Sequence, residues 1–113
     1  MRKVLLLTLA LAIAACAWAA PAKVTLNGIL IDKACSKDPK AVPAEHGKDC
    51  ALMDDCVKTG YGVVTADGKF TPFDTVGSKT ALRWLNTTKG KNNLKVTVTG
   101  TMDGGVLKVE SIK

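Results

Sequence analysis

Three of the four cysteines and the only histidine of the chain lie within one short segment of the sequence. These residues are Cys35, His46, Cys50 and Cys56, and Asp32 lies just upstream of them. Cysteine sulfur and histidine nitrogen are ligands that zinc and copper prefer in proteins. The four residues therefore predict a site for zinc or copper, although their spacing is not that of a recognised zinc finger, ribbon or knuckle.

A disulfide that fastens this segment is the competing prediction, because exported proteins commonly pair their cysteines. If residues 44–58 form one helix, Cys50 and Cys56 are about 9 Å apart along the helix axis. A disulfide needs Cα atoms about 4.4–6.8 Å apart, so an unbroken helix keeps these two residues from pairing. Cys35 would then pair with Cys50 or with Cys56, and a helix break near Asp54 would also allow Cys50 to pair with Cys56.

A reactive thiol is the third interpretation of the segment. In the same helix His46 would lie one turn before Cys50, and a neighbouring imidazole can activate a thiol. The sequence has no C-x-x-C motif, and no orienting acid is identifiable. We therefore predict no catalytic residue and no enzymatic activity, with a thiol-based redox protein that uses Cys50 or Cys56 as the alternative.

The first residues have the order of a secretory signal peptide. Two basic residues precede an apolar run from Val4 to Ala15, and small residues follow it. One interpretation is a signal peptide over residues 1–19. The alternative is a lipoprotein signal over residues 1–15, after which Cys16 would be lipidated. Either interpretation predicts an exported protein, periplasmic or extracellular, and the second predicts a lipid anchor at the outer membrane.

The distribution of charge argues against nucleic acid as a partner. The chain has a formal net charge of +6, and removal of residues 1–19 with their two basic residues lowers it to +4. The lysines are spread along the chain, whereas nucleic-acid-binding proteins usually gather them in a patch with aromatic residues. We expect contact with a membrane only through a lipid on Cys16, and the sequence leaves the ligand and the partners open.

Alternating apolar and polar residues predict five strands, which cover residues 23–32, 62–66, 69–73, 94–101 and 106–112. Asp67-Gly68 between the second and third strands is a strong hairpin signal. Two helices are expected, one over residues 44–59 and a shorter one over residues 78–86 that Ser78 would cap.

This order predicts a β-rich α+β fold, in which residues 20–113 form a single OB-like domain. The expected architecture is a small five-stranded barrel with a helical insertion between strands 1 and 2 and a short helix between strands 3 and 4. The insertion would carry the cysteines and the histidine. The alternative is a curved five-stranded sheet with both helices packed on one face.

Four motifs lie along the chain after the leader, namely GILIDKAC at residues 28–35, H-x-x-x-C at 46–50, VTVTGT at 96–101 and V-x-S-I at 109–112. Together they resemble a group of short exported bacterial proteins of unknown function. The resemblance implies export and an OB-like β-barrel, and it implies no catalytic residues.

Overall fold

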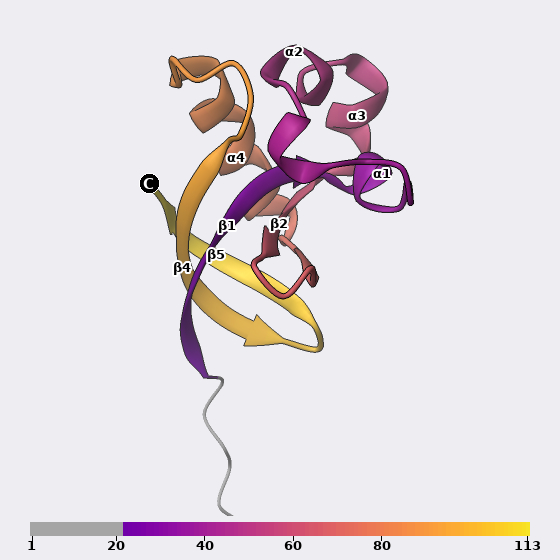
Figure 1. Ribbon diagram of the computed structural model, residues 1–113. Helices are drawn as coiled ribbons and strands as arrows, with labels where there is room; N and C mark the ends of the chain where they lie inside the picture. The colour runs from indigo at the N-terminus through magenta and orange to yellow at the C-terminus, as the bar shows by residue number, and fades with distance from the viewer. Residues whose placement is uncertain (1–21) are drawn as a thin grey trace, which may run out of the picture.

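The computed structural model describes residues 22–113 and contains a five-stranded antiparallel sheet (Figure 1). The strands are β1 (Lys23–Asp32), β2 (Tyr61–Thr65), β3 (Phe70–Pro72), β4 (Lys95–Asp103) and β5 (Val106–Ile112). The expected signal peptide over residues 1–19, the alternative lipoprotein signal over residues 1–15 and the lipidation site at Cys16 lie outside the described residues.

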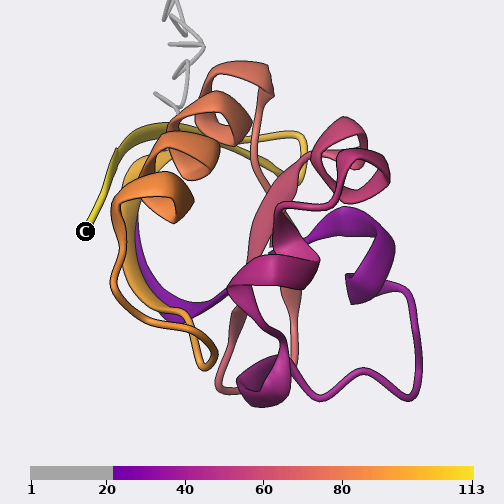
Figure 2. The ribbon, with the colours of Figure 1, turned by 90° about the horizontal axis from the view of Figure 1, so that it is seen from above.

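The long strand β1 lies at the centre of the sheet, whose strand order is β3-β2-β1-β4-β5. Its first part, residues 23–29, pairs with β4, and its last part, residues 28–32, pairs with β2. The sheet curves strongly as a result, and the insertion between β1 and β2 projects away from β4 and β5 (Figure 2). The last three residues of β1, Leu30 to Asp32, are buried, whereas Lys33, which follows them, is exposed, so Asp32 lies at the point where the chain leaves the core.

Gly28 marks the point where β1 passes from one neighbouring strand to the other. It pairs with Thr65 in β2 and with Val96 in β4. A Cβ atom on residue 28 would lie 2.3 Å from the backbone oxygen of Val64, which is closer than any real Cβ contact. Only glycine therefore allows β2 to approach the strand this closely at the bend.

The two edge strands approach each other through an isolated parallel bridge between Phe73, just after β3, and Leu107 in β5. The helix α4 (Thr75–Thr87) follows directly and packs mainly against β5. Its buried residues include Ala81 and Leu85, which are four positions apart and therefore lie on one face of the helix.

The hydrophobic core lies between the inner face of the curved sheet, α4 and the insertion. Tyr61, Leu30, Leu85 and Leu107 are among its largest fully buried side chains. Helix α4 contributes one face to this core, with Ala81 and Leu85 buried and Leu82 and Trp84 packed against it.

The prediction of one helix over residues 44–59 is wrong. The segment contains the 3-10 helix η1 (Pro43–Glu45) and two short helices, α2 (Lys48–Ala51) and α3 (Asp54–Thr59). Gly47 and Met53 take extended backbone conformations, with ψ of 156° and 139°, and each interrupts the helix. Directly after β1, the chain also forms a further single helical turn, α1 (Lys33–Ser36).

Other boundaries agree more closely with the sequence. The hairpin at Asp67-Gly68 is confirmed, and Gly68 has the positive φ of 80° that favours glycine. The second helix begins at Thr75 rather than Ser78, because the carboxylate of Asp74 accepts a hydrogen bond from the backbone N–H of Gly77 at 2.8 Å. The fold is thus β-rich α+β, as predicted.

Candidate metal centre

Asp32 begins the site at the buried end of β1. One carboxylate oxygen, Oδ2, accepts a hydrogen bond from the backbone N–H of Cys35 at 2.9 Å and so caps α1. The side chain has no exposed surface. This capping contact fixes the orientation of the carboxylate and holds Cys35 one turn away from it.

His46 approaches the same carboxylate from the segment after η1. Its Nε2 lies 2.9 Å from Oδ1 of Asp32, and its side chain is only 6% exposed. The distance is that of an ion pair, but the contact is not aligned as a hydrogen bond, and neither atom has a hydrogen-bond partner among residues 22–113. Two buried polar atoms thus face each other with unsatisfied bonding capacity, which is costly unless another group completes the arrangement.

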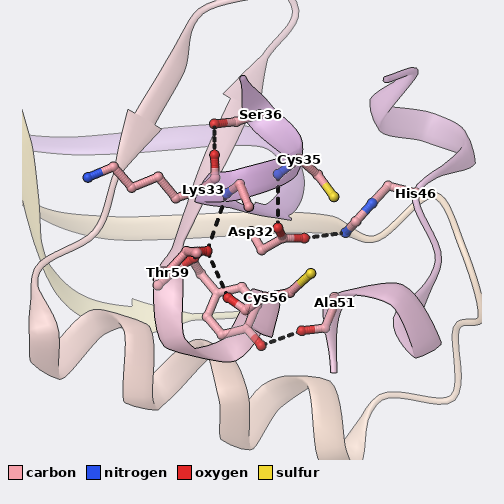
Figure 3. Close-up of polar contacts among 11 residues, drawn as sticks. Asp32, Lys33, Cys35, Ser36, His46, Ala51, Cys56 and Thr59 are labelled. Atoms are coloured by element: carbon pink, nitrogen blue, oxygen red, sulfur yellow. Dashed lines mark hydrogen bonds and ion pairs between the residues drawn. The ribbon is translucent and has the colours of Figure 1, made fainter. Parts of the chain in front are cut away.

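The cysteines gather around this pair. The ligand atoms of Cys35, His46 and Cys50 lie within 4.8 Å of one another, and those of Asp32, Cys35 and Cys56 do so as well. Figure 3 shows the sulfur atoms of Cys35 and Cys56 beside the Asp32 carboxylate, on the side that faces His46. All four predicted ligands therefore lie in one region, where Cys35 belongs to both groups.

The three thiols differ in exposure. Cys50 is exposed, whereas Cys35 and Cys56 are half-buried, and all three are free. Among residues 22–113 no pair of cysteines is at disulfide distance, so neither expected bridge from Cys35 is formed. The break in the predicted helix removes the geometric argument that kept Cys50 and Cys56 apart.

The electrostatics of the cluster favour uncharged thiols. Burial, and then the neighbouring Asp32 carboxylate, raises the pKa of Cys35 from 9.0 to about 12. The same two causes raise the pKa of Cys56. Cys35 and Cys56 are thus both shielded from water and both lie beside the same buried carboxylate. No lysine or arginine forms an ion pair with Asp32 within the described residues.

Two hydrogen bonds hold the short helices α1, α2 and α3 in place. The hydroxyl of Tyr61 donates to the backbone oxygen of Ala51 at 2.5 Å and so fastens α2, which carries Cys50, to β2. The hydroxyl of Thr59 accepts from the backbone N–H of Ala34 at 3.2 Å and joins α3 to α1. The helices that carry the cysteines are therefore fastened both to the sheet and to one another.

Asp32 was noted in the sequence as lying upstream of the cysteines, but it was not predicted to be part of the site. A carboxylate at the end of the apolar run GILID is the signal that identifies it, since a charge at the inner end of a buried strand requires a partner. The partner is His46, fourteen residues later, and no local pattern connects the two.

Comparisons of the chain with known protein families, curated proteins and solved structures return no match. Within residues 22–113 no helix is long and apolar enough to cross a membrane. The resemblance to short exported bacterial proteins therefore stays a prediction, and the case for function depends on the geometry of the cluster.

Proposed function

We propose that the protein is an exported module that binds a thiophilic metal ion, either zinc or copper(I), at the cluster around Asp32. Cys35, His46 and Cys50 supply the ligands, and Asp32 orients His46. The observation that carries this proposal is the buried contact between Asp32 Oδ1 and His46 Nε2, in which neither atom has a hydrogen-bond partner in the part of the chain that the structure describes.

The chemistry of the donor set fits such an ion. A metal-bound histidine commonly directs its second ring nitrogen to a carboxylate, which fixes the ring and strengthens the ligand. The contact between His46 and Asp32 supplies that pair. In the metal-free protein the Asp32 carboxylate disfavours ionisation of the neighbouring thiols. A bound cation reverses this effect, because its positive charge stabilises the thiolates and offsets the charge of the carboxylate. Zinc and copper(I) both accept a nitrogen ligand together with two sulfur ligands.

The fold supports this role as a scaffold. We further propose that the curved sheet is an OB-like barrel, with the parallel bridge between Phe73 and Leu107 as the contact between its edge strands. The insertion that carries the site then occupies the connection between the first two strands. This connection is a loop that OB-like proteins often use for ligands.

Native mass spectrometry of the metal-free protein, titrated with zinc or copper(I) under reducing conditions, tests the proposal. A Cys16→Ser background leaves only the three cysteines of the cluster. We expect one ion per chain, and a loss of at least about tenfold in affinity in Cys35→Ser, His46→Gln and Cys50→Ser. Asp49→Asn, a change beside Cys50 in the same helix, is the matched control and should bind normally. Unchanged binding in all three ligand variants would refute the assignment. Chelators with known affinities for the two ions distinguish zinc from copper(I).

The alternative function is that of a thiol redox protein in which Cys35 forms a disulfide with Cys50 or Cys56. The observation in its favour is that the sulfur of Cys35 lies within 4.8 Å of both other sulfur atoms. The raised pKa of Cys56 argues against it as the attacking thiol, because the thiolate is the nucleophile. Thiol counting in denaturant, without reductant and in the Cys16→Ser background, separates the two. Three free thiols support the metal site, and one free thiol supports the disulfide.

A further inference from the structure

A pocket of about 410 Å³ lies between α3 and the first half of α4, and its lining includes Tyr61 but no residue of the metal cluster. Its apolar lining comes from Val57 in α3, Phe73 after β3 and Leu82 in α4. The three residues come from separate elements that the core holds in place. The volume suits a small organic molecule, since ligand pockets usually measure about 300–1,000 Å³.

Three lysines surround this apolar lining. Lys33 comes from α1, Lys58 from α3 and Lys79 from α4, and all three are exposed. The pocket has no aspartate or glutamate in its lining. None of the three ammonium groups forms an ion pair or a hydrogen bond with another residue in the described part of the chain. The pocket therefore combines an apolar interior with positive charge that has no partner.

Two other hollows of the described surface lack this combination. The larger one, of about 700 Å³, is lined beside Val42 and Val64 and has Lys95 as its one charged residue. The smaller one, of about 450 Å³, contains lysines but also the carboxylate of Asp49. The pocket between α3 and α4 differs from these two because its lining combines apolar residues with three lysines that have no ion-pair partner within the described residues.

A hydroxyl group adds a directed polar contact at the pocket. Ser78 Oγ accepts a hydrogen bond from the backbone N–H of Tyr61 at 3.1 Å. Because this contact uses the oxygen as an acceptor, the hydroxyl hydrogen remains available to a ligand. A group that accepts hydrogen bonds and carries negative charge satisfies both Ser78 and the lysines.

We propose that this pocket binds a small organic anion with an apolar body, of the class of medium-chain carboxylates. The apolar part lies against Val57, Phe73 and Leu82, and the carboxylate lies among Lys33, Lys58 and Lys79. This site is separate from the metal centre, and its occupation requires no metal.

Titration of the ¹⁵N-labelled, metal-free protein with octanoate, followed by amide chemical shifts, tests the proposal. We expect saturable shifts at Val57, Gly60 and Leu82. The triple variant Lys33→Gln, Lys58→Gln, Lys79→Gln should bind about tenfold more weakly, as the summed effect of three exposed charge contacts.

The matched control is the triple variant Lys40→Gln, Lys91→Gln, Lys113→Gln, which makes the same change in net charge at exposed lysines outside the lining of the pocket. It should bind octanoate within about twofold of the parent, since distant exposed charges are screened. Octan-1-ol, which has the same chain without the charge, should bind more weakly than octanoate. The assignment would be overturned if both triple variants weakened binding equally or if the alcohol bound more tightly than octanoate. It would also be overturned if the shifts were confined to Val42 and Val64, which line the hollow of about 700 Å³.

Discussion

Oδ1 of Asp32 lies 2.9 Å from Nε2 of His46, and both side chains are almost completely withdrawn from solvent. The two residues are held by different elements, Asp32 by the end of β1 and His46 by the segment after η1. Their contact joins the insertion to the sheet at the place where the thiols gather. In the proposed metal site this contact sets the orientation of the histidine ligand.

Replacement of Asp32 by asparagine tests that role. Asp32→Asn keeps the size of the side chain and removes its charge, so we expect zinc affinity to fall about 10–100-fold, as for other carboxylates that orient a metal-bound histidine. Competition with a zinc chelator measures the affinity. Asp38→Asn removes the same charge from an exposed turn and should leave affinity within about twofold of the parent. Equal losses in the two variants would show that only net charge matters.

The thiols of the metal-free protein should react with iodoacetamide in a fixed order. Cys50 is exposed, whereas Cys35 is half-buried with its pKa raised to about 12. At pH 8 such a thiol contains about a thousandfold less thiolate than one with a pKa of 9.0, because each pH unit is a factor of ten. Peptide mapping by mass spectrometry should find Cys50 alkylated first and Cys35 last. In urea the difference should disappear, and comparable rates in the folded protein would contradict the structure.

Titration of Tyr61, the only tyrosine, tests whether its hydroxyl group is buried against α2. Burial, followed by the nearby Asp32 carboxylate, raises the pKa of Tyr61 from 10.0 to about 12. The phenolate absorbance near 295 nm should therefore appear about two pH units later than in the unfolded chain. Appearance of this absorbance near pH 10 in the folded protein would show that the Tyr61 hydroxyl is accessible.

The free energy of unfolding should depend on pH through Tyr61. A pKa that folding raises contributes stability that is fully present below pH 10 and is lost as the pH rises towards 12. Urea unfolding at pH 9 and pH 11 should show this decrease. Tyr61→Phe should lose about 1 kcal/mol at pH 9, because its hydrogen bond to Ala51 is absent, and should show a smaller decrease between the two pH values.

Gly28, at the bend of β1, should be required for the stability of the fold. Gly28→Ala places a methyl group 2.3 Å from the backbone oxygen of Val64, and the strands must separate to admit it. We expect a loss of about 1–3 kcal/mol in the free energy of unfolding. Gly90→Ala is the control, because its added carbon lies 3.8 Å or more from other atoms. Urea denaturation should show no loss for that control, and an equally stable Gly28→Ala variant would contradict the close approach.

The strands and their hairpins could be predicted from the sequence because their signals are local. Alternation of side chains defined residues 23–32 and 106–112, and Asp67-Gly68 defined the turn between β2 and β3. The start of α4 was placed three residues late because Asp74, rather than Ser78, caps it. Both residues are good caps, and the choice depends on tertiary packing against β5.

The geometry of the candidate site could not be predicted from the sequence, because it depends on contacts between residues that are distant along the chain. Residue types identified Cys35, His46, Cys50 and Cys56, which the structure brings into one region. The breaks at Gly47 and Met53 depend on how the insertion packs, and helix propensity alone did not reveal them. The contact between Asp32 and His46 is long-range in sequence, so only the folded chain shows it.

In the proposed site, sulfur and nitrogen atoms of this cluster bind one metal ion. Zinc-edge X-ray absorption of the zinc-loaded protein in the Cys16→Ser background measures the ligands directly. We expect sulfur scatterers at about 2.3 Å together with a histidine nitrogen at about 2.0–2.1 Å, and loss of the histidine signal in His46→Gln. A first shell of oxygen atoms alone, or a spectrum unchanged in His46→Gln and Cys35→Ser, would contradict it.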